Sequence, residues 1–115
     1  MQFLFTNHFK KQIKRLQKKF PKLKKDLIEE LKSFELKQGI YIGKSIYKIR
    51  IKSSDQNRGK SGGLRSYAYF YIKKDLLVPL CIYSKNEVSS ISQNELEYHF
   101  KNVLFEISKL FTGTT

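Results

Sequence analysis

The chain has 115 residues, of which 40% are hydrophobic and 14% aromatic, and this favours one folded domain over two domains or a disordered chain. Its net charge of +13 favours a polyanionic partner such as nucleic acid. Because Cys81 is the lone cysteine and no apolar run approaches the roughly 20 residues that span a bilayer, we expect a reduced, cytoplasmic protein without membrane contact.

The positive charge is concentrated in the first part of the chain. Residues 1–60 hold 17 Lys and Arg against 5 Asp and Glu, a net charge of +12. Residues 61–115 hold 6 against 5, a net charge of +1. Binding of such a surface to nucleic acid would release condensed counterions, and this release would favour the complex. The alternative is a lysine-rich protein without that partner, since 19 of the 23 basic residues are lysines.

Residues 1–40 are predicted to form a short strand and a helical hairpin. The strand lies within Phe3 to Phe5, and Asn7 is a suitable N-cap for a helix that runs to about residue 19. Pro21 ends this helix and lies in the first turn of the next one. Apolar residues recur with helical spacing in both segments. They are Phe9, Ile13, Leu16 and Phe20, then Leu23, Leu27, Ile28, Leu31 and Phe34.

An antiparallel sheet is predicted over residues 44–88. Gly39 and Gly43 mark a loop, after which the apolar period changes from helical spacing to alternation. The strand near 46–52 alternates isoleucines with basic residues, and the strand 64–72 alternates apolar residues with Arg65 and three tyrosines. The strand 76–84 is apolar on both sides, and its Pro79 indicates either an unpaired edge or a bulge.

A C-terminal helix is predicted over residues 92–111, where Ser92 and Glu95 have capping-box spacing. The order β-α-α-β-β-β-α indicates a single domain of the α+β class, with two layers and all helices packed on one sheet face. We expect His8 and His99 on helix surfaces. The opposite sheet face is expected to be open to water or a ligand and to carry Arg50, Lys52, Arg65, Tyr83 and Lys85.

Three sequence motifs follow one another along the predicted sheet. They are Tyr47-Lys-Ile-Arg-Ile-Lys, then Arg58-Gly-Lys-Ser-Gly-Gly-Leu-Arg, then Ile82-Tyr-Ser-Lys-Asn-Glu. Their order and spacing resemble the RelE superfamily of toxin–antitoxin toxins, most closely its HigB-like branch. The resemblance implies a RelE-like fold and a ribosome-dependent mRNA endonuclease, or mRNA interferase, that inhibits translation. It also implies a cognate antitoxin, of the DNA-binding helix-turn-helix kind.

Metal-independent RNA cleavage, which needs no cofactor, defines the candidate catalytic residues. The 2′-OH attacks phosphorus, so the site needs a base, an acid and cations for the non-bridging oxygens. Arg65 is the first candidate for binding those oxygens, since a guanidinium can bridge two of them. Lys85 and Glu87 are candidates for proton transfer, and Tyr83 for stacking on a base or donating a proton. The alternatives are a salt bridge between Arg65 and Glu87 and aromatic packing of Tyr83.

The candidate RNA-binding residues are basic side chains of the strand 46–52 and of the glycine-rich turn. Lys48, Arg50 and Lys52 would bind flanking phosphates, and Arg58 and Lys60 would close over the RNA. For each of these residues, the alternative to RNA binding is a solvated position on the protein surface. The tyrosines of strand 64–72 are more consistent with cross-strand packing than with base stacking.

Two other functions fit parts of the pattern. A ParE-like toxin that inhibits gyrase would keep the fold without the cleavage residues. A non-catalytic double-stranded-RNA-binding module fits the α-β-β-β-α order. However, such modules place lysines at the start of the last helix, whereas this helix begins Ser92-Gln-Asn-Glu.

Overall fold

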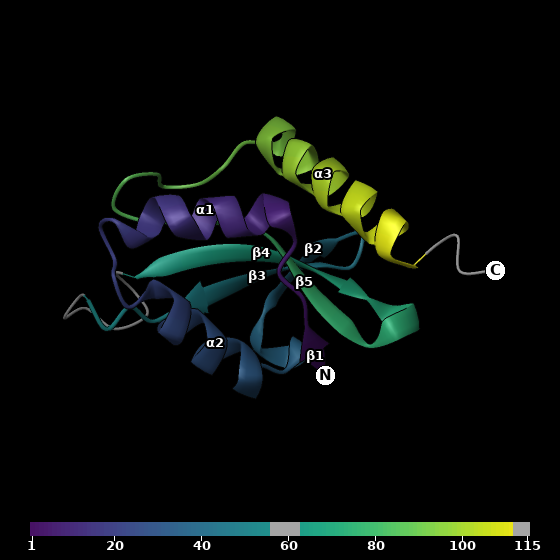
Figure 1. Cartoon of the computed structure of the whole chain (residues 1–115), viewed down its shortest axis with the longest axis horizontal. Helices are drawn as coiled ribbons and strands as arrows, with labels where there is room; N and C mark the ends of the chain where they lie inside the picture. The colour runs from purple at the N-terminus through teal and green to yellow at the C-terminus, as the bar shows by residue number, and fades with distance from the viewer. Residues whose placement is uncertain (56–62, 112–115) are drawn as a thin grey trace.

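The computed structural model describes residues 1–55 and 63–111 (Figure 1). Within these ranges, no helix is long and apolar enough to cross a bilayer. Short 3-10 turns cover Leu36–Gln38 and Ile72–Lys74. The remaining elements, in chain order, are β1 (Gln2–Phe3), α1 (Asn7–Gln17), α2 (Leu23–Ser33), β2 (Ile40–Gly43), β3 (Ile46–Ile51), β4 (Leu64–Tyr71), β5 (Leu76–Ser84) and α3 (Gln93–Phe111).

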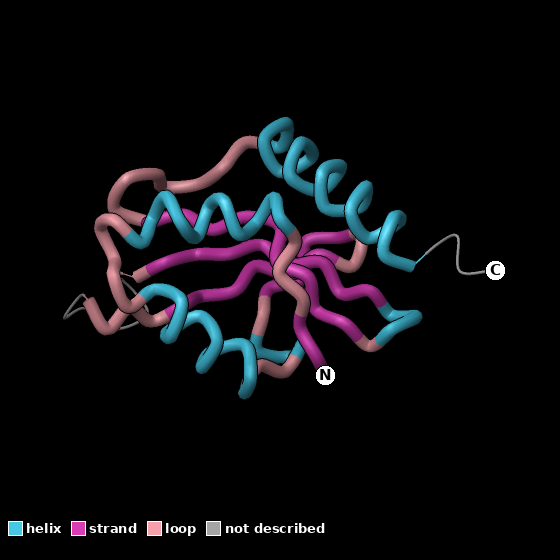
Figure 2. Tube along the Cα trace, in the orientation of Figure 1, coloured by secondary structure: helices cyan, strands magenta, loops and turns pink. Residues whose placement is uncertain are grey.

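The strands form one five-stranded sheet in the order β1-β5-β4-β3-β2. Figure 2 shows the strands fanning across one another, which is the twist expected of such a sheet. The antiparallel pairing of β3, β4 and β5 is confirmed. Two details of the prediction are wrong. β1 pairs with β5 in parallel, and the segment between Gly39 and Gly43 is the edge strand β2, paired with β3, rather than a loop.

α1 and α2 cover one face of the sheet. Their buried stripes join the strand residues Ile49, Ile51, Leu64, Ala68 and Ile82 in one hydrophobic cluster. These strand residues share a face because side chains alternate along each strand. The apolar stripes of α1 and α2 and the apolar face of the strands, both predicted from the sequence, therefore pack together in this cluster. The α+β class is confirmed.

α3 packs on the other face, so the prediction that all helices cover one face is wrong. Its buried residues Val103 and Ile107 belong to a second cluster, with Tyr67 of β4. Phe100 and Phe111 extend this packing, with ring centroids 5.1 Å from Tyr69 and 5.7 Å from Tyr71 respectively. The tyrosines of β4 are therefore packing residues, although Tyr69 and Tyr71 pack on α3 rather than across strands. The apolar stripe of α3 predicted burial but could not specify the face.

Local details of the ends of α1 and α2 differ from the prediction. Thr6, rather than Asn7, caps α1, and its Oγ1 accepts a hydrogen bond from the Phe9 amide at 3.2 Å. Both residue types cap well, and a shift of one position leaves the buried stripe unchanged. α2 begins at Leu23, so Pro21 precedes the helix instead of lying in its first turn.

The edge of β5 is closed by a side chain of α1. Gln12 Nε2 donates to the Leu80 carbonyl at 3.2 Å, and Gln12 Oε1 accepts from the Ile82 amide at 3.0 Å. The register between β4 and β5 shifts beside Pro79, which pairs with Ala68, so of the two alternatives predicted for Pro79 the bulge is confirmed. These contacts hold β5 in place, including Tyr83 near its end.

Candidate nucleic-acid interface

Three predicted site residues lie side by side across neighbouring strands. Arg50 of β3 is directly opposite Arg65 of β4, and Arg65 is directly opposite Tyr83 of β5. We call these residues the Arg50–Arg65–Tyr83 row. Because residues directly opposite one another project from the same face, the sheet brings the three side chains together.

The row is open at one end and buried at the other. Arg50 is exposed, whereas Arg65 is 4% and Tyr83 6% exposed. Arg65 Nη1 donates a hydrogen bond to the Leu64 carbonyl at 3.1 Å. The expectation of a uniformly open face is therefore wrong. The sequence could not show this, because burial on this face depends on elements distant in the chain, such as α3, whose Val103 and Ile107 share a hydrophobic cluster with Tyr83.

Burial and neighbouring charges shift the pKa values of two row members. Burial, and then the positive charge of Arg50, lower the pKa of Arg65. Burial, followed by the Tyr67 phenol, raises the pKa of Tyr83 to about 12. The Tyr83 hydroxyl has no hydrogen-bond partner of ordinary geometry among the described residues. Tyr83 therefore stays protonated near neutral pH and can donate a hydrogen bond or a proton, but is a poor base.

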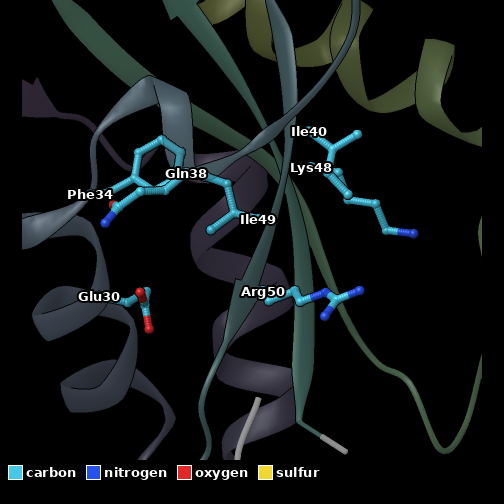
Figure 3. A pocket seen from close by; sticks show the side chains of 7 residues that line it. All are labelled: Glu30, Phe34, Gln38, Ile40, Lys48, Ile49 and Arg50. Carbon is cyan, nitrogen blue, oxygen red and sulfur yellow. The ribbon is translucent and has the colours of Figure 1, made fainter. Parts of the chain in front are cut away.

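Lys48 extends the basic surface beside the row. It lies opposite Tyr67 of β4, and its ammonium is 5.8 Å from the centroid of that ring. Lys48 and Arg50 also border a hollow of about 440 Å³ at the edge of β3. In Figure 3 both side chains point away from Glu30 and α2. The two cations are thus directed to the side of the sheet that carries the row.

Lys52 does not join this surface. It lies beyond the end of β3 and borders a different hollow, together with Asp26, Glu29 and Glu30 of α2. The Asp26 carboxylate also accepts hydrogen bonds from the Ser54 amide and hydroxyl, at 2.8 and 2.6 Å. Carboxylates around Lys52 make this a poor place for a phosphate. The alternation that placed Lys52 with Arg50 fails here because the strand ends at Ile51.

The remaining predicted site residues are less closely tied to the row. The Glu87 carboxylate forms an ion pair with Lys19, which follows α1, at 3.0 Å rather than with Arg65. Lys85 is exposed and follows directly after β5, where its amide donates to the Gly63 carbonyl at 3.3 Å. Arg58 and Lys60 lie outside the described residues.

A polar cluster between α1 and α3 was not predicted. His8 Nε2 and His99 Nδ1 are 2.7 Å apart, and both rings are partly buried. Burial is the main cause of the lowered pKa of each histidine. The Glu106 carboxylate accepts from the amides of Asn7 and His8 at 2.7 and 2.9 Å. The expectation of two ordinary surface histidines is therefore wrong, and no local pattern links residues so distant in the chain.

Comparisons with known proteins add no assignment. No protein-family model matches the chain, and no curated protein matches it.

Proposed function

We propose that the chain is the toxin of a type II toxin–antitoxin system and cleaves translated mRNA without a metal ion. Support comes from the row together with the motifs that resemble the RelE superfamily, because the row consists of residues from all three motif strands. The ribosome, mRNA and a cognate antitoxin are its proposed partners, and the cytoplasm, where messages are translated, is its proposed location.

The placement of two arginines directly opposite each other is the observation that carries this proposal. Like charges facing each other across a strand pair destabilise a sheet. A phosphate bound between Arg50 and Arg65 would offset this repulsion. A scissile phosphate develops further negative charge in the transition state, so the same pair would stabilise it more strongly during reaction.

In this site each member of the row has a distinct task. Arg65 would bind the non-bridging oxygens of the scissile phosphate, and Arg50 with Lys48 would hold the flanking backbone. Tyr83 would donate a hydrogen bond to an oxygen of the phosphate, or a proton to the leaving 5′-oxygen, because its high pKa keeps it protonated. Lys85, beside the end of β5, is the proposed proton-transfer partner. Glu87 has less support, because its carboxylate pairs with Lys19.

The second candidate is a toxin of the same fold that does not cleave RNA, either ParE-like or purely RNA-binding. The burial of Arg65 and Tyr83 favours it, because a substrate reaches only the exposed end of the row without rearrangement. A gyrase supercoiling assay beside an mRNA cleavage assay separates the two candidates.

The test is mRNA cleavage in a reconstituted translation system. We expect the wild-type protein to cut the message, and Arg65→Ala and Arg50→Gln to lose most of this activity. Arg65→Lys keeps the charge but loses the planar guanidinium, which can donate two hydrogen bonds at once. We therefore expect an intermediate loss of cleavage activity. Lys52→Gln is the matched control, because Lys52 lies two residues from Arg50 beside the carboxylates of α2. Full activity of folded Arg65→Ala would refute the proposed site.

A further inference from the structure

An exposed apolar groove lies between the start of the chain and the C-terminal half of α3. It has a volume of about 410 Å³, and Phe5, Phe105 and Leu110 are among the residues that line it. Phe105 is 61% and Leu110 54% exposed. We call this surface, with Lys10 and Lys109 at its rim, the α1–α3 groove. Large side chains this exposed and this close together are typical of an interaction surface.

The apolar surface continues along α1. A second hollow of about 280 Å³ shares Phe5 and Lys10 with the groove. It extends to Lys14 of α1 and Lys24 of α2, with Ile13 between them in the lining. The two hollows together form an elongated strip, and an extended or helical segment fits such a strip better than a small molecule does.

The rim of this strip is strongly positive. Lys10, Lys14 and Lys24 form no ion pair with a carboxylate of the described residues. Lys109 lies over the Phe105 ring, with its ammonium 4.4 Å from the centroid. Among the described residues of the lining, Glu106 is the single carboxylate, and both of its oxygens accept backbone amides at the start of α1. The lysines therefore remain available to an acidic ligand.

We propose that the α1–α3 groove binds an acidic amphipathic helix of a partner protein. Leucine-sized side chains of that helix would cover Phe5, Phe105 and Leu110, as in other helix-in-groove complexes. Its carboxylates would pair with the rim lysines and speed association. A second copy of this chain fits poorly, because two molecules of net charge +13 repel each other. This proposal is independent of the proposed nuclease, since the groove contains no member of the row.

The test measures binding of two labelled peptides by fluorescence anisotropy. One is a designed helix with leucines on one face and glutamates elsewhere. The other has the same composition in scrambled order, so it has equal charge and no apolar face. In about 0.15 M salt, which screens long-range attraction, we expect wild-type protein to bind the designed helix about tenfold tighter than the scrambled peptide.

Paired variants locate the binding surface. The double variant Phe105→Ser with Leu110→Ser should lose the preference for the designed helix. Ile72→Ser is the matched control, because Ile72 is 69% exposed and lies in the turn between β4 and β5. Thermal unfolding establishes that each variant is folded. If the double variant fails to fold, Lys10→Gln with Lys14→Gln replaces it and should weaken designed-helix binding.

Several results would overturn the proposal. Equal binding of both peptides would show attraction by charge alone, and a preference that survives in the folded double variant would place binding elsewhere. Binding of the protein to vesicles of phosphatidylserine and phosphatidylcholine is measured in parallel, as the test for a membrane surface. Vesicle binding that depends on Phe105 and Leu110, without a peptide preference, would identify a lipid surface instead. A dimer in sedimentation that these substitutions dissociate would identify a second copy.

Discussion

Replacing Arg50 by glutamine should stabilise the free protein and weaken its RNA binding at the same time. Arg50 directly faces the buried Arg65 across β3 and β4. Like charges in this arrangement cost about 0.2–1 kcal/mol, so we expect Arg50→Gln to raise the free energy of unfolding by about 0.5 kcal/mol. For a chain of this size that corresponds to a rise of about 2 °C in the unfolding midpoint.

The assay is thermal unfolding at low and high salt, with and without a short single-stranded RNA. The gain of Arg50→Gln should be largest at low salt and shrink as salt screens the two charges. The RNA should raise the midpoint of the wild-type protein more than that of the variant, because only the native wild-type site offers both guanidinium groups. Lys52→Gln should lack the low-salt gain, since Lys52 borders a hollow that carboxylate residues of α2 also line. A lower midpoint for Arg50→Gln at low salt would refute the reasoning.

Two further predictions concern the packing of α1. Gln12→Leu should destabilise the fold by about 1–3 kcal/mol in urea unfolding, because the Leu80 carbonyl and Ile82 amide lose their partner; an unchanged urea midpoint would contradict this. Stability should also fall as pH drops below about 6.5, because the pKa values of His8 and His99 are lowered on folding, so the unfolded chain binds more protons there. The double variant His8→Gln with His99→Gln should lose part of this pH dependence. A pH profile identical to that of the wild-type protein would contradict this prediction.

Strand alternation predicted the part of the site that depends on the sheet alone. Because side chains of β3, β4 and β5 alternate, placing Arg50, Arg65 and Tyr83 on one face required only the pairing of consecutive strands. The burial of Arg65 and Tyr83 was not predictable in this way. The burial of Tyr83 depends on α3, whose Val103 and Ile107 share its hydrophobic cluster, and the amphipathic stripe of a helix does not specify the sheet face on which the helix packs.

The other wrong predictions have separate causes. β2 is only four residues long and includes a glycine, so its alternation was too short to distinguish from a loop. Strand alternation predicted that Lys52 lies on the same sheet face as Arg50. This was wrong because nothing in the sequence indicates that β3 ends at Ile51. The contact between His8 and His99 joins residues 91 positions apart, and only the packing of α3 beside α1 brings them together.

The most direct test is the chemistry of the RNA ends that the protein produces on translating ribosomes. Attack by a 2′-OH leaves a cyclic phosphate on one fragment and a 5′-hydroxyl on the other. We predict new 5′-hydroxyl ends within translated messages when wild-type protein is added, and few or none with Arg65→Ala. No new ends with the wild-type protein, or the same ends with folded Arg65→Ala, would contradict the proposal that this row cleaves RNA.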